Sequence, residues 1–238
     1  MAILICTGWL LAQTGTEILQ KVDNNTVVTS SRYSATMLLS VGGTKREKRF
    51  TGYAAGKESA FMEFTYPARD KGTRFLKIGD EMWIYLPTVE KATKIAGHML
   101  RQSMMGSDFS YDDMLENEKL TRLYEIELTG TEIIEGRECF VLQLTAKVLE
   151  VNYFSRRMWV DKEMYVAVKV ELYAKSGKLL KEFSISEFGI IGPYRFPTKI
   201  RMENKLRKET YTELMLKDVE LDIKIPDRIF TKAYLERK

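Results

Sequence analysis

The sequence predicts a mainly β protein of the α+β class, built on one strongly curved antiparallel sheet of about eleven strands. Three observations support this prediction. Apolar and polar residues alternate in a long series of short segments, and glycine-rich or polar turns separate these segments at regular spacing. One mid-chain segment, residues 95–119, breaks the alternation. Because a sheet of this size must curl or fold over to bury an apolar face, we expect the helices to cover its concave side.

Size and composition fit a globular protein. The chain has 238 residues, of which 45% are hydrophobic and 29% charged, and its mean hydropathy is -0.25. These values exclude global disorder and a polytopic membrane protein. The net charge of +4 is too small for a dedicated nucleic-acid binder and permits only weak attraction to anionic lipid or an acidic partner. Since no linker or repeat divides the chain, we expect a single domain over residues 13–238.

The N-terminus carries a short apolar run, residues 3–12. It is too short to span a bilayer but resembles the apolar region of a secretory signal peptide, although no Lys or Arg precedes it. We therefore predict a signal peptide over residues 1–12 and export to the periplasm. The alternative is a buried N-terminal strand.

Only two cysteines occur in the chain. Ile5 precedes Cys6, where a lipid-attachment site needs a small residue, so we do not expect a lipoprotein anchor. Once the signal peptide is removed, Cys139 is alone and an intrachain disulfide is impossible. Cys139 lies in a strand-like run and is predicted to be a small buried hydrophobic residue rather than a nucleophile.

The elements follow in order along the chain. Thr14 and Glu17 have the spacing of a capping box and begin a predicted helix over residues 16–24. Hairpin turns are expected at Gly42-Gly43, Gly79-Asp80, 161–163 and 175–178. The predicted strands are residues 33–41, 48–54, 59–66, 73–78, 82–86, 122–129, 138–146, 151–160, 165–174, 179–188, 198–204 and 210–220.

The interrupting segment, which we call the plug (residues 95–119), has helical features. Met99, Leu100, Met104 and Met105 come first, and Ser110 followed by Asp113 has the spacing of a second helix start. The chain has twelve methionines, and several of them fall in the plug or in the strand expected beneath it. They fit either plain core packing or a surface that adapts to variable apolar ligands.

A search for catalytic groups identifies none. The single histidine, His98, has no evident nucleophile or orienting partner, and two cysteines with one histidine cannot form a common structural zinc site. Asp108 does not begin a calcium-binding loop. Such a loop needs Gly at its sixth position and Glu at its twelfth, and these positions are Asp113 and Lys119 here. We expect Asp108, Asp112 and Asp113 to cap helices and turns. The chain is therefore predicted not to be an enzyme and to use no metal or cofactor.

Basic residues cluster late in the chain. The cluster lacks interleaved aromatic residues, so it is weak support for nucleic-acid binding. It fits a solvated sheet face, or a face near a membrane surface. Its members are Arg195, Lys199, Arg201, Lys205, Arg207 and Lys208.

Two segments together resemble the outer-membrane lipoprotein-sorting (LolA-like) family: WIYLP at 83–87, preceded by TYP at 65–67, and GSDFSYDD at 106–113. Later parts of the chain also resemble the corresponding strands and C-terminal residues of this family. They are residues 159–162, residues 177–178, Phe230 and Leu235. The resemblance implies a half-open barrel whose cavity receives the acyl chains of a lipoprotein or another lipid in the periplasm. It implies an inner-membrane transporter and an outer-membrane acceptor as partners of a monomeric carrier. Known carriers hold their lid with an arginine near the strand leading into 65–67, where this sequence offers only Gly56-Lys57.

On this interpretation the strands supply the pocket wall and the plug moves aside. The wall is predicted to consist of Met62, Phe64, Trp83 and Tyr85, and the plug to contribute Met99, Met104, Met105 and Phe109. In the empty state the plug would fill the cavity and so avoid a large void. The alternative is a periplasmic sensor or an accessory subunit of an inner-membrane lipid transporter, which uses the same half-barrel to bind protein.

Overall fold

The alternating segments form strands of one sheet in the computed structural model, which describes residues 13–25, 28–116, 119–192 and 194–237. The predicted signal peptide, residues 1–12, lies outside the described residues. The strands are β1 (Ser30–Val41), β2 (Thr44–Ala55), β3 (Ser59–Tyr66), β4 (Arg74–Ile78), β5 (Glu81–Leu86), β6 (Lys91–Ile95), β7 (Tyr124–Ile134), β8 (Arg137–Ala146), β9 (Ser155–Asp161), β10 (Ala167–Tyr173), β11 (Leu179–Ile191), β12 (Tyr194–Asn204) and β13 (Thr210–Leu221).

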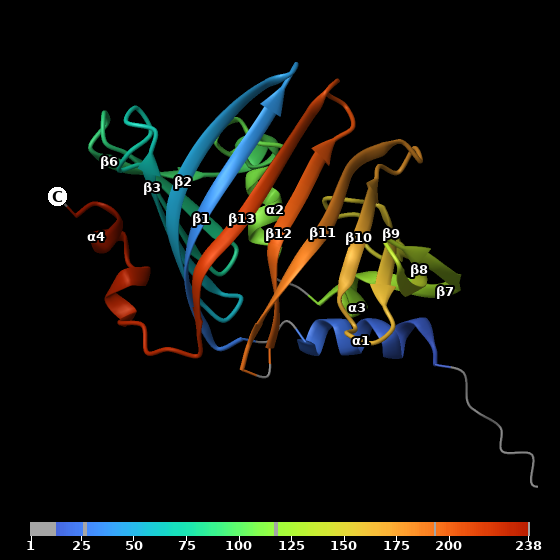
Figure 1. Cartoon of the computed structure of the whole chain (residues 1–238). Helices are drawn as coiled ribbons and strands as arrows, with labels where there is room; N and C mark the ends of the chain where they lie inside the picture. The colour runs from blue at the N-terminus through green and yellow to red at the C-terminus, as the bar shows by residue number, and fades with distance from the viewer. Residues whose placement is uncertain (1–12, 26–27, 117–118, 193, 238) are drawn as a thin grey trace, which may run out of the picture.

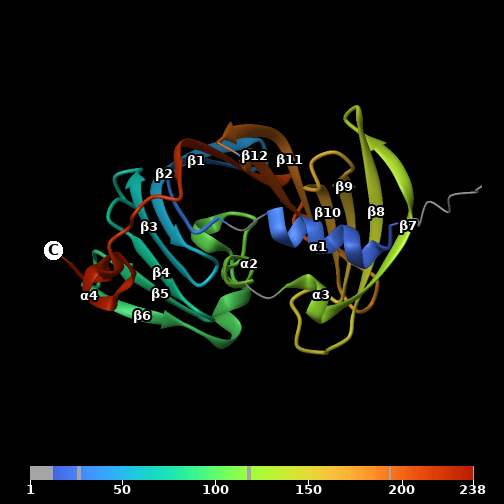
Figure 2. The ribbon, with the colours of Figure 1, turned by 90° about the horizontal axis from the view of Figure 1, so that it is seen from below.

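The described strands form a 13-stranded antiparallel sheet in the order β6-β5-β4-β3-β2-β1-β13-β12-β11-β10-β9-β8-β7. The strands β1 and β13 are paired neighbours in the middle of the sheet, where they join its N-terminal and C-terminal parts. Val41 pairs with Thr210 and Ser31 pairs with Leu221. The strands follow one another along an arc that stays open between β6 and β7, with α1, α2 and α3 inside it (Figures 1 and 2).

The sheet therefore has more strands than the predicted count of about eleven, and one more than the twelve strand segments named from the sequence. The strand that the sequence interpretation omits altogether is β6, the edge strand paired with β5. Its five residues, KATKI, include only one buried side chain, Ile95. An edge strand with so little burial lacks the apolar alternation that identifies the other strands.

One half of the concave face is covered by α1 (Gly15–Asn25) and α3 (Leu120–Leu123). The predicted capping box is present, because the Thr14 backbone N–H donates to Glu17 Oε2 at 2.9 Å and the Glu17 N–H donates to Thr14 Oγ1 at 3.2 Å. Ile18, Leu19 and Val22 then bury one stripe of α1. They pack against inward-facing residues of β7 to β10: Tyr124, Leu142, Leu144, Met158, Val160, Val170 and Leu172.

The other half is covered by the plug. It contains the 3₁₀ turns η1 (Gly97–Arg101) and η2 (Met104–Gly106) and the short helix α2 (Tyr111–Leu115). The predicted second helix start is confirmed, since Ser110 and Asp113 form a capping box in which the Ser110 N–H donates to Asp113 Oδ2 at 2.7 Å. In Figure 2 α2 lies inside the arc, facing β1 to β5.

The end of the chain covers the opposite, convex face. After β13 the chain forms η3 (Asp227–Phe230) and α4 (Lys232–Leu235), which lie outside the arc beside β3 to β5. Ile229 and Leu235 bury Phe61 and Leu76 there. The strands β3 to β5 are thus covered on both faces.

Cys139 is fully buried beside Val141, Trp159 and Val168. This burial confirms the prediction of a small buried hydrophobic residue, and it also raises the pKa of the thiol. Among the described residues, no helix combines the length and the apolar character needed to cross a membrane.

Candidate functional site

A methionine-rich cluster fills the space between the plug and the concave face of β1 to β6. Strand alternation turns Ala35, Met37 and Leu39 of β1 and Met62 and Phe64 of β3 to this face. The remaining buried members are Phe50, Phe75, Met82, Ile95, Met104 and Tyr111, and Met99, Met105 and Met114 pack against them partly buried. Seven of the chain's twelve methionines meet here. Because methionine is unbranched and polarizable, this packing can rearrange at low cost.

Little space remains under the plug. The cavity there has a volume of about 40 Å³ and lies among Met62, Phe75, Met82, Met104 and Met114. This volume suits a few water-sized groups and no longer chain. An apolar ligand can therefore occupy this part of the concave face only if the plug moves.

Polar bonds hold α2 to the sheet. The Asp113 carboxylate accepts a hydrogen bond from Lys181 Nζ of β11 at 2.5 Å, and another from the Tyr153 hydroxyl at 2.5 Å. Burial, and then the charge on Asp113, raise the pKa of Tyr153, which keeps the hydroxyl protonated as a donor. Just after α2, the Glu116 carboxylate accepts two hydrogen bonds from the buried Arg156 guanidinium of β9. Burial lowers the pKa of the Arg156 guanidinium, but its interactions with Glu116 and Tyr124 together raise that pKa above its ordinary value.

A third attachment joins the plug to β13. Asp108 is only 3% exposed, and its two carboxylate oxygens accept hydrogen bonds from the hydroxyls of Thr210 at 2.8 Å and Thr212 at 2.7 Å. The Asp108 backbone N–H donates to Thr212 Oγ1 at 2.9 Å. The sequence interpretation made Asp108 a cap; instead it connects the plug to a strand more than a hundred residues later. We call the bonds of Asp108, Asp113 and Glu116 to the sheet, together with the bond from the Tyr153 hydroxyl to Asp113, the latch.

The structure brings together five of the eight predicted site residues. Met62, Phe64 and Met104 are buried in the methionine-rich cluster, and Met99 and Met105 pack at its edge. Phe109 is 9% exposed and is not a member of that cluster, although its carbonyl accepts the Met104 N–H.

Trp83 and Tyr85 lie on the other side of the sheet. They pack with Phe61, Ile229 and Leu235 under the C-terminal segment. The Lys232 ammonium lies 4.3 Å from the centroid of the Trp83 ring. This corrects the predicted orientation of both side chains. The strand β5 is apolar at every position from Met82 to Leu86, so its sequence alone does not determine which side chains face inward.

A second apolar cavity is already open. It has a volume of about 340 Å³, within the range of small-ligand pockets, and lies near the C-terminal end of α1. Its apolar lining includes Val22, Val28, Ala167, Phe183, Ile185, Phe188, Phe196 and Pro197. The sequence interpretation missed these residues. Phe183 and Ile185 show the apolar alternation of a strand. The sequence around them does not indicate that α1 ends before it covers them.

The sheet residues that bind the latch, Lys181 and Arg156, were also missed, although they carry a signal. Lys181 has the same strand parity as Phe183 and Ile185, and Arg156 the same parity as Met158 and Val160. A charged residue in register with buried apolar neighbours is buried itself and needs a partner of opposite charge.

Comparisons with known proteins agree with this fold. A family model with the description "Uncharacterized protein" matches residues 56–237. A DUF1329 family protein from Desulfovibrio piger is 26% identical, with 93% of this chain and 97% of that protein covered and a TM-score of 0.86. An outer membrane lipoprotein-sorting protein domain from Vibrio parahaemolyticus is 24% identical, with 94% and 98% covered and a TM-score of 0.84. A LolA superfamily protein from Nitrosomonas europaea is 27% identical, with 94% and 100% covered and a TM-score of 0.76. None of the curated proteins matches the sequence.

Proposed function

This chain belongs to the outer-membrane lipoprotein-sorting (LolA-like) family, and we propose that it is a periplasmic carrier that binds the acyl chains of a lipoprotein or another lipid and hands them towards the outer membrane. In this proposal residues 1–12 direct export and residues 13–238 act as one carrier domain. An inner-membrane transporter loads it and an outer-membrane acceptor unloads it.

The physical need for a carrier follows from the cost of exposing acyl chains to water. Burying a methylene gains about 0.8 kcal/mol, so a chain of roughly fifteen carbons costs on the order of 12 kcal/mol in water. A carrier must offer an apolar site of nearly the same free energy as the membrane and still release its cargo. A preformed deep pocket would not release it readily, whereas a site that a mobile segment can refill would.

The observation that carries the proposal is the methionine-rich concave face, covered by a short plug that is held by a few polar bonds. The open cavity of about 340 Å³ offers an apolar surface before the plug moves. We propose that an acyl chain first enters this cavity. The plug then lifts, and the chain replaces Met104 and its neighbours against Met62 and Phe64.

Native mass spectrometry of protein purified from its own periplasm tests this directly, with titration of a fluorescent fatty-acyl probe as the second measurement. We expect bound acyl species and saturable probe binding. The variant Ala167→Trp fills the open cavity and should weaken probe binding at least about tenfold, as removal of about 1.4 kcal/mol of apolar contact does. Ala233→Trp on the exposed outer side of α4 is the matched control and should bind like the unchanged protein.

Absence of lipid in the purified protein together with absence of probe binding would refute the carrier function. Loss of binding in both tryptophan variants would show that Ala167 does not mark the site.

A further inference from the structure

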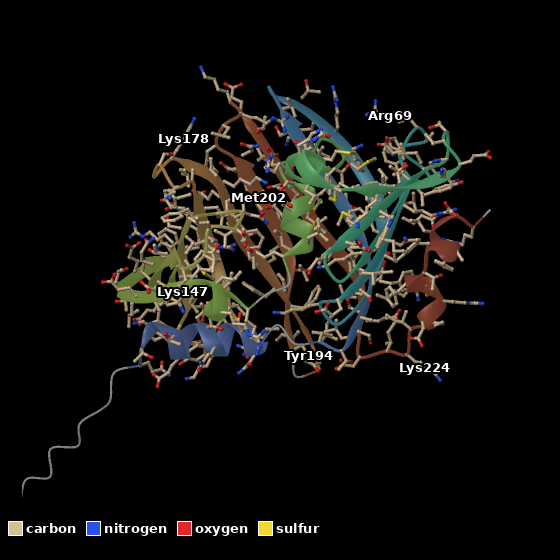
Figure 3. The ribbon with its side chains drawn as sticks, turned by 180° about the vertical axis from the view of Figure 1, so that it is seen from behind. Arg69, Lys147, Lys178, Tyr194, Met202 and Lys224 are labelled. Carbon is tan, nitrogen blue, oxygen red and sulfur yellow. The ribbon has the colours of Figure 1, made fainter. Side chains whose placement is uncertain are left out.

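Eleven of the 37 Lys and Arg residues of the chain gather at one end of the sheet. Antiparallel pairing brings four segments together there. They are residues 42–49, which form the β1–β2 turn and the adjoining start of β2, and the turns 67–73, 174–178 and 205–209, which join β3 to β4, β10 to β11 and β12 to β13. We call these four segments the basic rim. Arg69 and Lys178 of the rim lie at one end of the molecule in Figure 3, and Lys224 and Tyr194 lie at the opposite end.

The basic rim carries more net positive charge than the whole chain. Its segments contain eleven Lys and Arg against three Asp and Glu, a net formal charge of +8, while the whole chain carries +4. The rest of the chain is therefore net negative. Lys48 and Asp70 form a buried pair and Arg49 pairs with Glu47, while Lys205 and Arg207 pair with carboxylates outside the rim. Within the part of the chain that the structure describes, Lys71, Lys175 and Lys178 are exposed and form no salt bridge, so much of the excess charge faces solvent. Among the described residues, Lys45, Arg46 and Lys208 form no salt bridge and are exposed.

Exposed apolar side chains lie among these charges. Leu206 at the tip of the β12–β13 turn is 55% exposed, Val41 beside it is 40% exposed and Tyr66 is 46% exposed. The Gly42 N–H donates to the Glu209 carbonyl at 3.2 Å, which holds the two neighbouring turns together. A hollow of about 530 Å³ between them is lined by Arg201, Lys205, Arg207 and Lys208, with Glu203 and Glu209 also on its wall.

We propose that the basic rim docks the protein onto an anionic membrane surface, with lipid phosphates among the turns and Leu206 and Val41 at the acyl boundary. Positive charge spread over four separate turn tips fits a broad anionic plane better than it fits one acidic peptide. Isolated aliphatic side chains at those tips fit a surface with an apolar layer beneath its charges. The rim is distant from the cavity lined by Tyr194, so docking and acyl binding can be measured separately.

Co-sedimentation with vesicles tests the proposal. The probe is phosphatidylcholine vesicles with and without phosphatidylglycerol, at low salt and at about 1 M salt, where the Debye length is about 3 Å. We expect binding only to vesicles that contain phosphatidylglycerol, and loss of binding at high salt. The variant Lys45→Gln/Arg46→Gln/Lys208→Gln should lower the partition coefficient about 100-fold, and Leu206→Ser about tenfold.

The matched control is Lys217→Gln/Lys224→Gln/Arg228→Gln, which removes the same charge from exposed positions away from the rim. It should partition like the unchanged protein. Equal binding to neutral vesicles, absence of binding to anionic vesicles, or an equal loss in the control variant would overturn the proposal. Probe binding in the same rim variant shows separately whether the acyl site is intact, because no substituted rim residue lines either apolar cavity.

Discussion

Tyr153→Phe isolates one bond of the latch. The Tyr153 hydroxyl is 2.5 Å from Asp113 Oδ1, and both side chains are buried. The substitution removes this hydrogen bond and leaves the ring packed, while Asp113 retains its bonds from Lys181 and Ser110. It therefore weakens the closed position of α2 without leaving a bare carboxylate in the core.

The magnitude follows from the charged acceptor. A hydrogen bond to a charged group contributes about 1.5–3 kcal/mol. Removing one that exists only in the closed state raises the open population about 10–100-fold. If the ligand binds the open state, its apparent Kd decreases by the same factor until the open state dominates. The melting temperature should decrease by about 2–4 °C for each kcal/mol lost. The variant is thus expected to be less stable and to bind more tightly.

Fluorescent acyl-probe titration and thermal unfolding measure the two effects, and Tyr173→Phe is the control. The Tyr173 hydroxyl also lies 2.5 Å from a carboxylate, that of Glu171, but this pair is within β10 and does not touch the plug. The control should lose some stability and keep the original affinity. If Tyr153→Phe is destabilised and its affinity stays unchanged, opening of the plug is not part of binding and the reasoning fails.

Three further outcomes are expected. Trp83→Ala should lower the free energy of unfolding by about 3–5 kcal/mol in urea and leave probe affinity unchanged, because Trp83 packs under the C-terminal segment. Cys139 should resist iodoacetamide until the protein is denatured, because burial raises the pKa of its thiol. Burial raises the pKa of Asp23 above its ordinary value of 3.8, so its contribution to stability is present below that pH and lost as the pH rises through the folded-state pKa. Asp23→Asn should flatten this part of the curve of melting temperature against pH.

The sequence predicted features that depend on neighbouring residues. The shared face of Met62 and Phe64 on β3 follows from the two-residue repeat of a strand. The capping box at Thr14 follows from residues three apart. Both were correct because no distant segment can change them without breaking the element itself.

Features that depend on distant segments were not predictable in this way. Whether Trp83 faces the cavity or the outer surface depends on what covers each side of β5, and the outer cover, Ile229 to Leu235, is far away in sequence. The function of Asp108 likewise depends on Thr210 and Thr212 being brought to it by the pairing of β13 with β1. Local patterns identified Asp108 as a polar residue near a helix start and could not identify its partners.

In the proposed carrier, apolar contacts and polar contacts have different roles, and this difference accounts for reversible binding. When an acyl chain displaces the plug, the contacts of Met104 with Met62 and Phe64 are exchanged for contacts of methylene groups with the same wall, so the apolar terms nearly cancel. The bonds of the latch are not replaced by the ligand. We infer that the latch, more than the buried apolar area, sets how tightly cargo is held. A few hydrogen bonds of about 1–3 kcal/mol each can keep an empty protein closed and still allow a transporter or acceptor to shift the balance.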